Sequence, residues 1–305
     1  MTGITQGIDS RIPEGTLPGI SAKWLSRCVG DAEHFLARSF AKAPYLSRGD
    51  SGRFEGIFSR AELSRLLAMG IVPVTKVRLS NHDRAISARA WAKEENNIIV
   101  VDGERIERLI REGSTLVVSG VDRFAHGLFE LCGGLQAELS YRLGANIFLS
   151  PPFAQGFSTH VDEHDVIVLQ LEGEKDWQVY GSGGPIIQAR LRKGDSLYVP
   201  RGFAHCAASA DQSSLHASIG IRPATVADLL SYVVNEFAGS PELARTLQPG
   251  FAHRPDDLGP LLGASGQALG QQVEATGMDE LAHAFCHTWI NVRQRAARRI
   301  RGTTY

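Results

Sequence analysis

Short apolar runs dominate the middle of the chain, from residue 146 onward. They are rich in β-branched and aromatic side chains, and glycine or proline separates them. The clearest runs lie at residues 147–149, 166–171, 176–180, 196–200 and 215–221. Several short strands at regular spacing are typical of a sandwich or barrel. We therefore expect a mainly β core of the double-stranded β-helix or jelly-roll form, which is a cupin-like architecture.

Helical periodicity precedes this β-rich part. Ser59 and Glu62 resemble a capping box that opens a helix, and Gly70 is placed to end it. Apolar spacing predicts further helices at residues 31–41, 102–112 and 124–143, the last one broken or bent at Gly133 and Gly134. Strands are expected at residues 72–79 and 114–120. The β core thus carries helical and strand additions on its N-terminal side.

The β pattern ends at Arg222 and Pro223, and helical patterns follow. Thr225 and Asp228 have the spacing of a capping box. Helices are predicted at residues 225–237, 265–276 and 279–301. We therefore divide the chain into a β domain with its N-terminal additions, residues 1–225, and an α-helical C-terminal region, residues 226–305.

Composition excludes several classes of protein. Of 305 residues, 32 are Lys or Arg and 33 are Asp or Glu, so the net charge of −1 argues against a general polyanion binder. An arginine-rich stretch at residues 293–301 is interpreted as a solvated helix face, and direct nucleic-acid binding is not expected. No apolar run approaches the ~18 residues of a membrane span, so we expect no membrane association.

The cysteines indicate a compartment. Cys28, Cys132, Cys206 and Cys286 are far apart, and none forms a Cys-x-x-Cys pair. This spacing argues against a zinc knuckle and against a disulfide framework. Reduced thiols in a cytoplasm fit the pattern.

The candidate metal ligands lie in the β-rich segment. His160 and Asp162 are two residues apart, so in a strand both side chains point to one face and enter the barrel together. Two imidazoles and one carboxylate form the set of ligands that holds Fe(II) with open positions. His205 follows a strand and a Pro-Arg-Gly corner and is the preferred third ligand. His216 is the alternative, because it also lies in a β-like run.

A lysine stands on the same predicted strand face as two apolar residues. Lys175 follows the turn at Gly173 and alternates with Trp177 and Val179. A lysine on such a face needs an anion to pair with, and a carboxylate co-substrate supplies one. The alternative is a solvent-exposed hairpin lysine, and the local sequence leaves both interpretations open. His164 is interpreted as a residue at the rim of the cavity.

Three motifs in this segment resemble the JmjC (Jumonji C) oxygenases, most of all their ribosomal-oxygenase branch. They read NIFLSPPFAQGFSTHVDEHDVIVLQLEGEKDWQVY, GDSLYVPRGFAH and SLHASIGI, with weaker similarity in FLARSFAKAPYL and FSRAELSRLL. The resemblance implies a double-stranded β-helix that holds Fe(II) through His160, Asp162 and His205, with 2-oxoglutarate as co-substrate. It also implies that Lys175 grips the distal carboxylate of 2-oxoglutarate, and that Asn146 lines the same pocket.

The same resemblance implies an activity and a partner. It indicates a dioxygenase that hydroxylates an amino-acid side chain in a ribosomal protein or in a small precursor peptide. It also implies a homodimer formed through the helices after residue 225. Gly220 stands where some relatives have a hydroxyl residue, so a contact made by that hydroxyl is lost here.

Two alternative functions stay open. The first is N-methyl-lysine demethylation, because the same oxidant can hydroxylate an N-methyl group. The second is a cupin-like scaffold that holds metal without turnover, against which Lys175 argues, since a barrel without catalysis has no need to bind an anion. Target choice is expected to depend on loops at the rim of the cavity, such as residues 181–185.

Overall fold

The structure is a computed structural model that describes residues 22–81, 84–154, 156 and 158–301, with side chains described up to residue 289. The chain separates into two units. Unit 1 contains the described residues up to Leu139 and from Leu143 to Arg222, and unit 2 contains Ser140–Arg142 and the residues from Pro223 onward. The assignment of residues 1–225 and 226–305 to separate roles stays a prediction.

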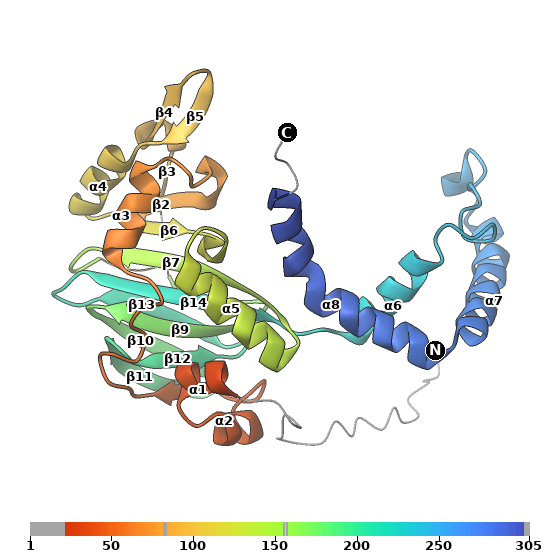
Figure 1. Ribbon diagram of the computed structural model, residues 1–305, viewed down its shortest axis with the longest axis horizontal. Helices are drawn as coiled ribbons and strands as arrows, with labels where there is room; N and C mark the ends of the chain where they lie inside the picture. The colour runs from red at the N-terminus through yellow and green to blue at the C-terminus, as the bar shows by residue number, and fades with distance from the viewer. Residues whose placement is uncertain (1–21, 82–83, 155, 157, 302–305) are drawn as a thin grey trace. The chain divides into compact units, whose positions relative to one another are not determined.

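Eight consecutive strands build the centre of unit 1 (Figure 1). One sheet has the strand order β12-β9-β14-β7 at its centre, and a second sheet has the order β11-β10-β13-β8. The strands are β7 (Arg142–Ser150), β8 (His160–Val161), β9 (Asp165–Glu172), β10 (Glu174–Gly181), β11 (Gly184–Arg192), β12 (Ser196–Val199), β13 (Ala204–Ser209) and β14 (Ser214–Arg222). The predicted jelly-roll core is therefore confirmed.

The two sheets enclose apolar side chains. Val168 of β9, Trp177 and Val179 of β10 and Leu197 of β12 belong to one buried cluster between them. β9 is buried from Asp165 to Leu171, as its continuous apolar sequence predicts for a strand covered on both faces. A sheet that is covered on both faces can hold polar groups inside the sandwich at fixed positions.

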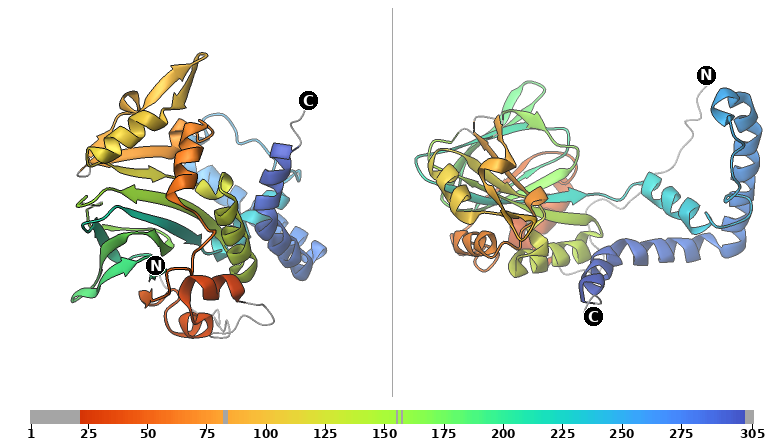
Figure 2. Two further views of the ribbon diagram at one scale, coloured as in Figure 1. Left: turned by 60° about the vertical axis from the view of Figure 1, so that its left-hand side comes forward. Right: turned by 90° about the horizontal axis from the view of Figure 1, so that it is seen from above.

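Additional strands extend the first sheet at both edges. β1 (Tyr45–Ser47) pairs with β12, and β6 (Thr115–Val118), β2 (Val77–Asn81) and β3 (Arg84–Ile86) continue the sheet beyond β7. A separate hairpin, β4 (Ala92–Glu95) with β5 (Ile98–Val101), projects from this end of the unit (Figures 1 and 2).

Five helices of the described residues lie on the outside of the first sheet, and three of them have side-chain caps. They are α1 (Lys23–Val29), α2 (Ala32–Arg38), α3 (Arg60–Ala68), α4 (Gly103–Arg111) and α5 (His126–Leu139). Asp31, Ser59 and Asp102 each accept a hydrogen bond from the backbone N–H three residues later, which satisfies a free helix donor. Phe35 of α2 packs edge-to-face on Tyr198 of β12, at 4.8 Å between ring centroids.

Two predicted boundaries in unit 1 are wrong. The helix predicted at residues 124–143 is α5, which ends at Leu139 and continues through both central glycines. Gly134 has a packing role instead, because a Cβ there would lie 2.2 Å from the indole of Trp24. The strand predicted at residues 72–79 begins only at Val77, because Val74–Lys76 form a 3-10 turn after Pro73.

Unit 2 is helical, as predicted. It contains α6 (Val226–Glu236), the 3-10 turns Phe251–His253 and Pro255–Asp257, α7 (Leu258–Thr276) and α8 (Met278–Arg301). Thr225 and Asp228 form the complete capping box at the start of α6. The side chains of the arginine-rich stretch 293–301 lie outside those that the structure describes. None of the helices in the described residues combines the length and hydropathy that crossing a bilayer takes.

Candidate active site

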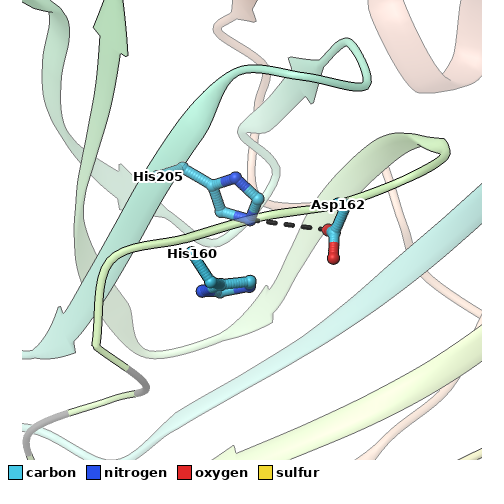
Figure 3. A group of neighbouring side chains, drawn as sticks. All are labelled: His160, Asp162 and His205. Atoms are coloured by element: carbon cyan, nitrogen blue, oxygen red, sulfur yellow. Dashed lines mark ion pairs between the residues drawn. The ribbon is translucent and has the colours of Figure 1, made fainter.

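The structure brings the predicted ligand set together. His160 lies on β8, Asp162 lies just after it, and His205 lies on β13. β8 and β13 are antiparallel neighbours, and His160 is directly opposite His205 in their register. One ligand atom from each of the three side chains lies within 4.8 Å of the others. Figure 3 shows the two imidazoles and the carboxylate around a common space.

Backbone contacts orient both imidazoles in the same way. His160 Nδ1 lies 2.9 Å from the carbonyl oxygen of Ser158, and His205 Nδ1 lies 3.1 Å from that of Phe203. A carbonyl oxygen only accepts, so each Nδ1 donates its proton, and Nε2 is the nitrogen of each ring that can bind a metal. This is the arrangement that fixes metal-binding histidines in other proteins.

The electrostatic environment of these three side chains favours the binding of a cation. Burial lowers the pKa of His205, and the adjacent His160 lowers it further, so the ring stays neutral at physiological pH. Asp162 Oδ2 lies 3.6 Å from His205 Nε2. Two neutral imidazoles and one carboxylate are the donors that Fe(II) prefers in sites with open positions. The residues present therefore fit a divalent iron ion.

A cavity of about 500 Å³ opens beside these side chains. Its wall combines apolar side chains from both sheets with a comparable number of polar and charged side chains. The predicted site residues in its lining are Asn146, His160, Asp162, Lys175 and His205. The rim residue His164 and the alternative ligand His216 also line it.

Lys175 is buried, which rules out the solvent-exposed interpretation. Its side chain points inward with Trp177 and Val179, as predicted, and the residue is 3% exposed. Nζ donates a hydrogen bond to Ser150 Oγ at 3.0 Å. Burial lowers the pKa of Lys175 to about 8. Within the described part of the chain no carboxylate pairs with this ammonium, so an anionic ligand would complete its environment.

Two other predicted residues have defined surroundings. Asn146 Oδ1 accepts a hydrogen bond from the backbone N–H of Gly120 at 3.0 Å, which leaves the amide nitrogen of this cavity-lining residue for a ligand. His216 is not among the clustered ligand atoms, because its ring stacks on Phe148 at 4.7 Å between centroids and 4° between planes. Of the two sequence candidates for the third ligand, the structure therefore places His205 beside His160.

Sequence reasoning missed residues that line the cavity or contact Lys175, among them Phe148, Arg78 and Ser150. Ser150 and Phe148 lie on β7 with Asn146, and the spacing of two residues could have placed all three on one strand face. Arg78 of β2 also lines the cavity. No local signal connects β2 with the barrel, because the connection depends on β6 pairing with both β2 and β7.

Comparison with protein families identifies the central part of the chain. The model described as JmjC domain matches residues 132–185 and 180–229. Ribosomal oxygenase 1 of Gallus gallus is 30% identical over 213 residues, which cover 61% of this chain and 34% of that protein. The bifunctional lysine-specific demethylase and histidyl-hydroxylase NO66 of Dictyostelium discoideum is 27% identical over 67% of this chain and 43% of that protein. The chain thus spans less than half the length of these two relatives.

Solved structures show the same fold. The Escherichia coli ribosomal oxygenase YcfD in complex with cobalt and 2-oxoglutarate aligns with a TM-score of 0.51 and 19% sequence identity. The alignment covers 84% of this chain and 70% of that chain. Another YcfD structure aligns with a TM-score of 0.50 at 19% identity and covers 85% of this chain and 69% of that one. At this identity the likeness concerns the fold.

Proposed function

We propose that this chain, which carries a JmjC domain of the ribosomal-oxygenase type, is an Fe(II)- and 2-oxoglutarate-dependent dioxygenase that hydroxylates an amino-acid side chain in a protein or peptide. One observation carries the proposal: a single cavity is lined by a His-Asp-His ligand set and by a buried lysine. A metal scaffold without turnover has use for the first group but not for the second.

The metal is assigned to His160, Asp162 and His205. Three protein ligands leave further coordination positions for a chelating co-substrate and for dioxygen. When bound, Fe(II) and 2-oxoglutarate would activate dioxygen, so that one oxygen atom enters a C–H bond of the substrate and the other enters succinate as 2-oxoglutarate loses carbon dioxide. The structural neighbour that contains cobalt and 2-oxoglutarate supports both assignments.

The residues of this chain bind and orient 2-oxoglutarate and exclude water from the cavity. Lys175 is assigned to the distal carboxylate of 2-oxoglutarate, because its buried ammonium faces the cavity. Asn146 is assigned to the same pocket through its free amide nitrogen. Apolar residues such as Val168 and Trp177 form the wall and keep water out. Ser150 holds the lysine side chain in position through its hydroxyl group.

The names of the relatives support a protein or peptide as the proposed substrate. Their names include ribosomal oxygenase and histidyl-hydroxylase, so a ribosomal protein is the first target to test and a small precursor peptide is the second. The name of one relative also includes lysine-specific demethylase. Mass spectrometry separates the two outcomes, since hydroxylation adds one oxygen atom and demethylation removes a methyl group.

Two features of the whole protein belong to the same proposal. The helices of unit 2 are proposed to form a homodimer, which is supported by exposed apolar side chains at a spacing of four residues on α6, namely Val226, Leu230 and Val234. A reducing compartment such as the cytoplasm is proposed because all four cysteines are free thiols.

The test combines turnover with product mass. Wild-type protein is incubated with Fe(II), 2-oxoglutarate and a library of ribosomal proteins and short peptides, and intact masses are recorded. We expect one target to gain one oxygen atom, with succinate formed in proportion. Asp162→Ala should abolish both signals. Full turnover by Asp162→Ala, or no 2-oxoglutarate turnover by the wild type with any target, would overturn the proposal.

A further inference from the structure

His216 is a buried polar residue in the cavity wall to which the proposed function assigns no role. His216 lies on β14 and is 3% exposed, yet it lines the cavity. Its Nδ1 atom is buried and has no hydrogen-bond partner among the described residues. A buried polar atom without a partner costs free energy, so a residue kept in this state calls for an explanation.

Aromatic neighbours hold the ring in one orientation. His216 stacks on Phe148 of β7, and Trp177 of β10 meets it edge-on at 5.4 Å between centroids and 80° between planes. Phe148 comes from the same sheet as His216, and Trp177 comes from the opposite one. A ring clamped between two sheets loses little freedom when it binds a ligand, and this favours a binding role.

The electrostatic environment keeps the ring neutral. Burial lowers the pKa of His216 well below 6.5, and the charge of Lys175 lowers it further. A neutral imidazole carries one N–H group. An orphaned buried N–H is rarer than an orphaned acceptor, so the buried Nδ1 is assigned the lone pair and Nε2 the proton. His216 therefore presents one hydrogen-bond donor to the cavity, which Lys175 also lines.

We infer that His216 and Lys175 together form a two-donor cradle for the distal carboxylate of a keto-diacid, in which the imidazole N–H positions the carboxylate that the ammonium neutralises. This inference rests on the proposed function, because the keto-diacid is its co-substrate. The pairing suits a carboxylate, which has two oxygen atoms and accepts one donor at each. A monocarboxylate keto-acid of the same length lacks the group and gains nothing from His216.

A packing role alone makes a different prediction. If His216 only fills space between Phe148 and Trp177, then His216→Phe changes stability and leaves ligand selectivity unaltered. His216→Phe keeps an aromatic ring between these neighbours and removes both nitrogens. His216→Gln keeps an N–H donor near the position of Nε2. The matched control is His126→Phe, since His126 is an exposed histidine at the start of α5.

The experiment measures binding without turnover. Mn(II)-loaded wild type and variants are titrated calorimetrically with 2-oxoglutarate and with 2-oxopentanoate, which has the same chain but no distal carboxylate. For His216→Phe we expect about tenfold weaker binding of 2-oxoglutarate, the effect of one hydrogen bond to a charged group. We expect 2-oxopentanoate binding to stay within twofold of wild type, His216→Gln to recover most of the loss, and His126→Phe to match wild type.

The possible outcomes distinguish failure of the proposed function from failure of the two-donor cradle. If wild type does not bind 2-oxoglutarate in the presence of Mn(II), the proposed function itself is overturned. If wild type binds it and His216→Phe binds it equally well, only the cradle is overturned. An equal loss for both keto-acids also overturns the cradle, because it indicates a general distortion of the cavity. Urea unfolding of the metal-free variants checks that His216→Phe keeps the wild-type fold.

Discussion

Replacing Lys175 with methionine should stabilise the ligand-free protein. The ammonium is buried, and its pKa is about 8 in place of the ordinary 10.5, so folding is penalised while the group is charged. This difference corresponds to about 3 kcal/mol at neutral pH. Loss of the hydrogen bond to Ser150 offsets ~1 kcal/mol of that gain. Lys175→Met is therefore expected to raise the free energy of unfolding at pH 7 by about 2 kcal/mol.

The stability difference between Lys175→Met and wild type should depend on pH. Below pH 8 the lysine is charged in both the folded and the unfolded state, and the folded state carries the full burial penalty. Between pH 8 and 10.5 the folded state loses its proton first, so the stability of the wild type rises with pH. The advantage of Lys175→Met should therefore fall to roughly zero near pH 10.

The assay is urea unfolding of metal-free protein at pH 7 and pH 10, followed by tryptophan fluorescence. The control is Lys193→Met, which alters an exposed lysine in the turn before β12 and should change nothing at either pH. A Lys175→Met variant that is less stable than wild type at pH 7, or that keeps the same slope with pH, would refute the argument. Such a result would mean that water or another group solvates the ammonium.

Three further predictions use the same structure. Affinity for 2-oxoglutarate should fall as pH rises through about 8, because Lys175 then loses the proton that neutralises the carboxylate, and calorimetry in buffers of different ionisation enthalpy should detect proton uptake on binding. Glu138→Ala should lower the free energy of unfolding by roughly 2–3 kcal/mol, because its buried carboxylate accepts the backbone N–H groups of Trp24 and Leu25, each at 2.8 Å; an unchanged urea midpoint would contradict this. Val234→Glu should shift sedimentation from dimer to monomer without loss of helical circular dichroism, and a wild type that sediments as a monomer would remove the dimer from the account.

Local chemistry made several elements predictable. Ser59 and Thr225 cap helices because their hydroxyl groups accept backbone N–H bonds within one turn, which depends on adjacent residues alone. The continuous apolar run of β9 predicts a buried strand for the same reason. The burial of Lys175 was one of two open readings, since alternation with Trp177 only shows which face the lysine shares.

Elements that depend on distant pairing were not predictable. β13, Ala204–Ser209, is composed of small and polar residues with no clear alternation, and it is a strand because β10 and β8 pair with it on either side. The choice between His205 and His216 depended on this pairing, because only the register places His205 opposite His160. The role of Gly134 likewise depends on Trp24, which lies far away in the sequence.

The ligand set itself is tested most directly by anaerobic titration of the metal-free protein with Fe(II). Wild type should bind one ion per chain at a site formed by His160, Asp162 and His205. His205→Ala should weaken that binding by at least about tenfold, since it removes one of three protein ligands. Stoichiometric binding of equal affinity in wild type and His205→Ala would contradict the assignment, as would a wild type that binds no Fe(II).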